Sequence, residues 1–125
     1  MRKIFLMMIF AFVTAFSVNI CYATDVWFHT EIDRNGYKTE YYLMTQYIKE
    51  DYQKGTFDVG IKSVFYQNGT MTGRPYQFAY LNGEWYFTQT NSSSGYENVK
   101  YNEFFKKVFN ACKPYVRLAR EYPIY

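Results

Sequence analysis

The segment at residues 76–90, YQFAYLNGEWYFTQT, constrains the fold more than any other part of the chain. Asn82-Gly83 stands between two aromatic-rich runs, and this dipeptide is typical of a two-residue type I′ turn because both positions adopt positive φ. A two-residue loop fixes the register of the flanking strands. The sequence therefore predicts four facing pairs, Leu81–Glu84, Tyr80–Trp85, Ala79–Tyr86 and Phe78–Phe87, and alternation places the pairs of Phe78 and Tyr80 on a core face.

Three further runs alternate with the period of a strand, at residues 25–32, 37–48 and 56–66. Asn35-Gly36 and Asn68-Gly69 follow two of them as turn signals. In the first run, strict alternation predicts Val26, Phe28, Thr30 and Ile32 on one face and Trp27, His29 and Glu31 on the other. In the third run, Gly60 indicates a bulge or a close approach of another group to the backbone.

After residue 95 the period changes to that of a helix. Apolar side chains recur three and four residues apart, which gives an amphipathic stripe: Tyr101, Phe104, Phe105, Val108, Phe109 and Cys112. Pro114 ends this helix, and a second, shorter helix can follow it. Strands joined by short turns and then a helix predict an α+β fold, an antiparallel sheet of about five strands with a C-terminal amphipathic helix packed on one face.

The chain begins with Arg2 and Lys3, followed by an uncharged apolar run over residues 4–18. This layout is typical of a secretory signal peptide and is short for a membrane span. Cleavage after Ala23 is favoured, cleavage after Ser17 is the alternative, and lipidation of Cys21 is a third possibility. We expect residues 1–23 to be a signal peptide and residues 24–125 to be one exported α+β domain, without a transmembrane helix, that is secreted, periplasmic or at the cell surface.

Charge and cysteine content limit the function further. Without Arg2 and Lys3 the net charge falls from +3 to +1, so the domain lacks the basic excess of a nucleic-acid-binding protein. Cys112 is the single cysteine after Ala23, and it pairs with Cys21 only if Cys21 survives processing. The core, not a disulfide framework, must therefore stabilise the fold.

Candidate chemistry is sparse. His29, Glu31 and Asp33 alternate, so on an extended strand the three would point one way as weak candidates for a metal site, but a solvated strand end explains them better. Cys112 and His29 are residue types that can act as nucleophile and base, but Cys112 lies on the apolar stripe, where a free cysteine behaves as a small hydrophobic residue. The chain has no phosphate loop or nucleophile elbow. We therefore expect no catalytic residues and no cofactor.

Tyrosine is the unusual component, with 15 in 125 residues. A domain of this size cannot bury all of them, and tyrosine is enriched in interfaces because its ring supplies contact area at low entropic cost. Half-exposed tyrosine is also simply a good strand residue. As candidate binding residues on the sheet we take Tyr41, Tyr47, Tyr66 and Tyr86.

The order of elements resembles that of the bacterial surface-adhesin protein E family. The resemblance rests on an early Trp27, the Tyr41-Tyr42 pair, the long strand at residues 56–66 and a helix that bears Cys112. It implies a sheet tied to the helix by a disulfide and display outside the cell to bind host proteins. No binding residue carries over, and the chain departs from the pattern if Cys21 is removed.

The sequence thus predicts a small exported bacterial domain without catalytic activity that binds a protein or an envelope or glycan ligand through exposed tyrosines. The alternative is a small metal-dependent or hydrolytic enzyme that uses His29, Glu31 and Asp33.

Overall fold

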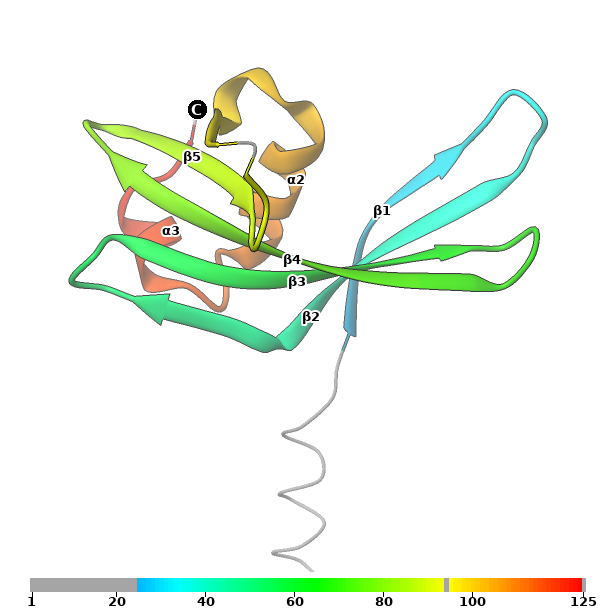
Figure 1. Ribbon diagram of the computed structural model, residues 1–125, viewed down its shortest axis with the longest axis horizontal. Coiled ribbons are helices and arrows are strands. Elements are labelled where there is room, and N and C mark those ends of the chain that lie inside the picture. The colour runs from blue at the N-terminus through cyan, green and yellow to red at the C-terminus, as the bar shows by residue number, and fades with distance from the viewer. Residues whose placement is uncertain (1–24, 94, 125) are drawn as a thin grey trace, which may run out of the picture.

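A computed structural model describes residues 25–93 and 95–124, which form a six-stranded antiparallel sheet with short helices against one face (Figure 1). Neighbouring strands in the chain are neighbours in the sheet, in the order β1 to β6. The strands are β1 (Asp25–Ile32), β2 (Lys38–Asp51), β3 (Thr56–Phe65), β4 (Thr70–Leu81), β5 (Glu84–Gln89) and β6 (Glu97–Asn98). The helices follow as η1 (Val99–Tyr101), α2 (Glu103–Cys112) and α3 (Arg117–Glu121).

The hairpin of β4 and β5 has the predicted register. All four predicted pairs, from Leu81–Glu84 to Phe78–Phe87, face each other across the two strands. Asn82 and Gly83 have φ of 52° and 83°, as a type I′ turn requires. Ala79, on the face opposite the core pairs, is also buried; its neighbours on the flanking strands are Thr56 and Tyr86.

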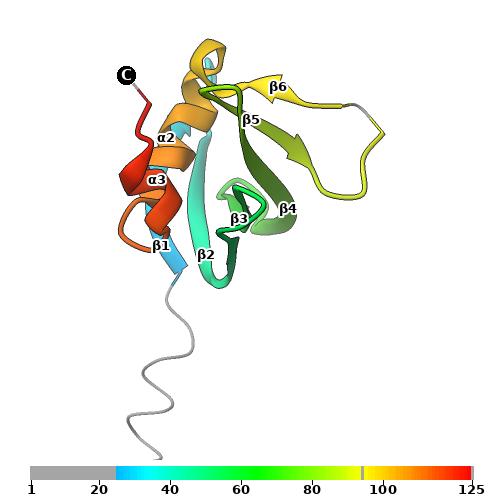
Figure 2. The same cartoon turned by 90° about the vertical axis from the view of Figure 1, so that its left-hand side faces the viewer.

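The core lies between the helices and the middle of the sheet. Phe57 and Phe78 stack with ring centroids 4.8 Å apart, and Phe109 of α2 lies 6.1 Å from each ring. Phe105 of the same helix stacks on Phe87 at 3.8 Å. We call the sheet face that these helices contact the helix side; Figure 2 shows the helices gathered there against the curled sheet.

Polar side chains accept hydrogen bonds from the backbone amides in the first turns of α2 and α3. The Asn102 side chain accepts a hydrogen bond from the Phe105 amide at 3.1 Å, which caps α2. Glu50 of β2 accepts from the Leu118 amide at 2.6 Å in the first turn of α3. Asn98 caps η1 in the same way, because its side chain accepts a hydrogen bond from the Lys100 amide at 3.0 Å.

The antiparallel sheet with helical cover is confirmed in outline, and its finer details differ from the prediction. The sheet has six strands instead of about five, because residues 97 and 98 pair with β5. The predicted helix and the second, shorter helix after Pro114 correspond to α2 and α3, and the 3-10 turn η1 precedes them. Tyr101, predicted on the apolar stripe, is 79% exposed, since it lies in η1 before the Asn102 cap.

Two irregularities in the strands overturn the predicted faces. In β1 the register shifts between Trp27 and His29, so Phe28 and His29 both turn to the helix side and Trp27, Thr30 and Ile32 share the other face. In β2 the register shifts between Met44 and Lys49. As a result Tyr47 lies on the face opposite Tyr41, whereas strict alternation over residues 37–48 would place both on one face.

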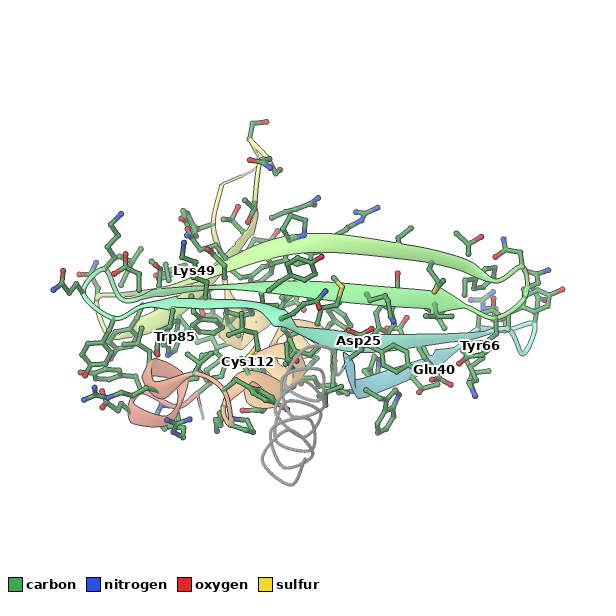
Figure 3. All side chains as sticks on the ribbon, turned by 90° about the horizontal axis from the view of Figure 1, so that it is seen from below. Asp25, Glu40, Lys49, Tyr66, Trp85 and Cys112 are labelled. Carbon is green, nitrogen blue, oxygen red and sulfur yellow. The ribbon has the colours of Figure 1, made fainter. Side chains whose placement is uncertain are left out.

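The helices cover only part of the sheet. Figure 3, in which the view is from below, shows Trp85 and Cys112 among the helices and Glu40 and Tyr66 at the far end of the strands, where no helix lies. We call this far end, with the β1–β2 and β3–β4 turns, the uncovered end; it comprises residues 30–40 and 62–73, beyond His29 and Tyr41, which α2 still contacts.

The predicted signal peptide, both cleavage positions and Cys21 lie outside the described residues. Within residues 25–93 and 95–124, no helix is long and apolar enough to cross a membrane.

Candidate functional site

The structure brings His29 and Glu31 together but not Asp33. His29 Nε2 lies 3.3 Å from Glu31 Oε1. Asp33 instead accepts hydrogen bonds from the backbone amides of Asn35 at 2.8 Å and Tyr37 at 3.0 Å, so its carboxylate holds the β1–β2 turn. Among the residues that the structure describes, no three His, Cys, Asp or Glu side chains group as metal ligands. His29, Glu31 and Asp33 therefore do not form a set of metal ligands in the structure.

His29 is fixed by packing and by two polar neighbours. Its ring stacks on Tyr41 at 5.7 Å and meets the edge of Phe104 at 5.9 Å. The Lys107 ammonium lies 3.1 Å from His29 Nδ1. Because an ammonium only donates, Nδ1 accepts and Nε2 carries the hydrogen that points to Glu31. This bond network orients the side chains and leaves no free nucleophile among the described residues beside His29.

Tyr41 closes one wall of a cavity of about 240 Å³ on the helix side, beside the first turn of α2 and next to the uncovered end. Its hydroxyl donates to Glu31 Oε2 at 3.3 Å, and burial, with Glu31 nearby, raises the pKa of Tyr41 above its ordinary value. Phe104 packs edge-on against the Tyr41 ring at 4.9 Å. The remaining lining residues are Ile61, Ser63, Thr72, Arg74 and Tyr76. Sequence reasoning missed this cavity, since its walls come from β2, β3, β4 and α2.

The other three candidate tyrosines lie on the sheet face opposite the helices, which we call the open face. Tyr47 and Tyr66 are 56% and 51% exposed, and Tyr86 is half-buried. The Tyr86 hydroxyl lies 3.3 Å from Glu84 Oε2. Trp27 is 56% exposed on the same face. From the β5–β6 loop the Tyr96 hydroxyl reaches Gln77 of this face at 2.9 Å, but in the described part of the chain no helix covers Trp27, Tyr47 or Tyr66.

A hollow of about 440 Å³ interrupts the open face. Gly60 and Gly73, without side chains, leave room for it, and Met44 lies over both: its Cε would be 2.9 Å from a Cβ at Gly60 and 3.3 Å from one at Gly73. Tyr47 lies beside Gly60, within 3.3 Å of the same added Cβ. Gly60 therefore marks the close approach that the sequence suggested, and the β2 irregularity supplies the wall.

Between the hollow and the strand turns, the open face carries a network of charges and phenols. Lys38 Nζ lies 2.8 Å from Glu40 Oε1, and the Tyr42 hydroxyl donates to Glu40. The hydrogen bonds of Lys38 and then of Tyr42 lower the pKa of Glu40. The same bond to Glu40 raises the pKa of Tyr42, because it is available only to the protonated phenol. Lys38, Glu40 and Tyr42 thus meet one another's hydrogen-bonding and charge requirements, and their role is structural.

Cys112 is fully buried on the helix side and is the free cysteine of the described residues. Burial raises the pKa of the thiol to about 12. A thiol with this pKa is protonated at neutral pH and is a poor nucleophile. His29 belongs to the group of aromatic rings around Tyr41 and Phe104, and no contact joins it to Cys112 in the structure.

Comparison of the chain with protein-family models, with curated protein sequences and with solved structures gave no match.

Proposed function

We propose that the protein is a small exported, non-catalytic binding protein whose open face contacts a protein or an envelope or glycan ligand. The observation that carries the proposal is the contrast between the two sheet faces. The large apolar side chains at the centre of the helix side, such as Phe57 and Phe78, are fully buried, whereas Trp27, Tyr47 and Tyr66 of the open face are each more than half exposed. Exposed aromatic groups that gather on one face are typical of an interaction site.

Two properties of the open face support this function. Tyr47 and Tyr66, with Trp27, offer rigid rings with polar tips, the side-chain types that dominate binding energy at protein interfaces. The hollow beside Tyr47 offers a concave position for an anchoring side chain, with the thioether of Met44 as an adaptable wall. A flat surface without such a hollow would bury less of a ligand.

Export is the second part of the proposal and rests on residues 1–23. Met1, the basic pair and the apolar run match the signal-peptide pattern, and the resemblance to surface adhesins suggests the same compartment. Intact mass of the protein from medium, periplasm and membrane fractions tests this part. A chain that starts at Thr24 or Val18 in a fraction outside the cytoplasm is expected, and an unprocessed cytoplasmic chain would contradict export.

The binding surface is tested with paired variants. The protein is immobilised as wild type, as Tyr47→Ser with Tyr66→Ser, and as Tyr101→Ser with Tyr115→Ser, and each is exposed to the same cell-envelope and host extracts. Tyr101 and Tyr115 are exposed as well, at 79% and 46%, but lie in η1 and in the turn between α2 and α3, away from the open face. The control therefore removes as many phenols from another surface.

We expect the open-face variant to lose a bound species that both other forms retain. Loss after protease treatment of the extract identifies a protein partner, and retention identifies a glycan or lipid component. Equal capture by all three forms contradicts the assignment of the open face.

A further inference from the structure

The cavity on the helix side contains the one arginine whose surroundings suggest a ligand. Arg74 faces Ile61 in the register, so its exposed side chain starts from the helix side and lines the cavity, and the same residue also borders the hollow beside Tyr47. Within the described residues, the side chain of Arg74 makes no ion pair, hydrogen bond or ring contact. Most other charged groups at this end of the sheet are paired, including Glu31 with His29 and Lys62 with Asp25.

The walls of the cavity are held in place independently of any ligand. Tyr76 packs edge-on against Phe105 at 5.0 Å, as Tyr41 does against Phe104 at 4.9 Å. Ile61 at the base is 5% exposed. Such packing restricts the rotamers of the ring walls, so binding costs little side-chain entropy there.

Hydroxyl groups supply the remaining polar lining. Ser63 Oγ and Thr72 Oγ1 lie 2.6 Å apart on neighbouring strands, and one donates to the other. The pair therefore keeps one hydroxyl hydrogen and free lone pairs for a further partner. Glu31 is not among the lining residues, and its carboxylate is engaged by Tyr41 and His29.

We propose that this cavity binds a small organic carboxylate, with the guanidinium of Arg74 on the carboxylate and the apolar body of the ligand among Tyr41, Tyr76 and Phe104. The planar fork of arginine matches two carboxylate oxygens. The volume of about 240 Å³ is below that of common ligand sites, so the ligand has on the order of ten non-hydrogen atoms. A single arginine with aromatic walls suits a monoanion with an apolar group better than a multiply charged phosphate.

Benzoate is the probe, with benzamide as its neutral counterpart and sulfate as an anion without an apolar body. Each is titrated into the ¹⁵N-labelled protein while amide resonances are followed. We expect benzoate to give saturable shifts at Ser63, Thr72 and Arg74, and benzamide and sulfate to bind at least about tenfold more weakly. No benzoate binding, or equal binding of benzamide or of sulfate, overturns the proposal.

Arg74→Gln should weaken benzoate binding by about tenfold or more, and Arg74→Lys should restore only part of the affinity because lysine lacks the planar fork. Arg34→Gln is the matched control, since Arg34 lies in the exposed β1–β2 turn and its replacement removes the same charge. Unchanged affinity in Arg74→Gln, or equal losses in both variants, would contradict the site. The Tyr47→Ser, Tyr66→Ser form should bind benzoate normally, so failure of this site and failure of the open-face proposal are separate results.

Discussion

The same long strands behave differently at their two ends. Near the helices, β3 presents Phe57, Val59 and Ile61 to the core, and all three are buried. Toward the uncovered end the same face of β3 continues with Ser63 and Phe65, both half-buried. The strand is continuous, but its surroundings change from an apolar core to cavity and solvent.

Element lengths explain the difference. The 14 residues of β2 extend over about 46 Å, whereas the 10 residues of α2 make a helix of about 15 Å. A helix of that length cannot cover such a strand. We therefore expect the covered half, which holds the buried core, to supply most of the stability. The uncovered end has hydrogen-bonded strands, a charged network and exposed side chains, which are usual properties of regions available for binding.

The largest expected effect comes from the centre of the covered half. Phe78→Ala removes a fully buried ring that stacks on Phe57 and contacts Phe87, Phe105 and Phe109. We expect a loss of about 3–5 kcal/mol in the free energy of unfolding, from lost transfer energy and the cavity left behind. Val64→Ala at the uncovered end should cost less than about 1 kcal/mol. Urea unfolding measures both; similar losses would mean that the two ends contribute equally.

A second effect in the covered half depends on pH. Burial raises the pKa of Cys112 from 9.0 to about 12, so above pH 9 the unfolded chain loses a proton that the folded protein keeps. The contribution of Cys112 to stability is constant below pH 9 and falls by about 1.4 kcal/mol per pH unit between these two values.

Cys112→Ala isolates this term, because the tyrosines and lysines titrate in both forms. We expect the stability advantage of the wild type over Cys112→Ala to shrink by about 2 kcal/mol between pH 9 and 10.5. An advantage that stays constant over this range would show that the thiol is reached by solvent in the folded protein.

Sequence reasoning worked where local chemistry decides the structure. Asn82-Gly83 admits one kind of tight turn, so the register of the β4–β5 hairpin followed from it. The stripe containing Val108, Phe109 and Cys112 likewise identified the buried side of α2.

The same reasoning failed in β1 and β2, where the pairing register shifts and strict alternation of the side chains is broken. Strict alternation assigned Tyr47 to the face of Tyr41 and grouped Phe28 with Ile32, and the irregularities in β1 and β2 reversed both. No residue type in those segments signals such a bulge. The cavity around Arg74 was equally hidden, because it requires the relative placement of four elements distant in the sequence.

The smallest effect concerns the network on the open face of the uncovered end. Glu40→Gln removes the ion pair with Lys38 and weakens the bond from Tyr42. Because Lys38 is exposed and water screens the pair, we expect a small drop in melting temperature, well below that of Phe78→Ala, which added salt reduces further.

The pKa of Glu40 is lowered from 4.5 in the folded protein, so its contribution to stability is present above that pH and disappears as the pH falls through the lowered value. Melting curves of wild type and Glu40→Gln should therefore converge in acid, with Glu97→Gln, an exposed carboxylate without an ion pair in the described structure, as the control. A large loss from Glu40→Gln that persists in high salt would instead make this network a main support of the uncovered end, and the contrast between the two ends would not hold.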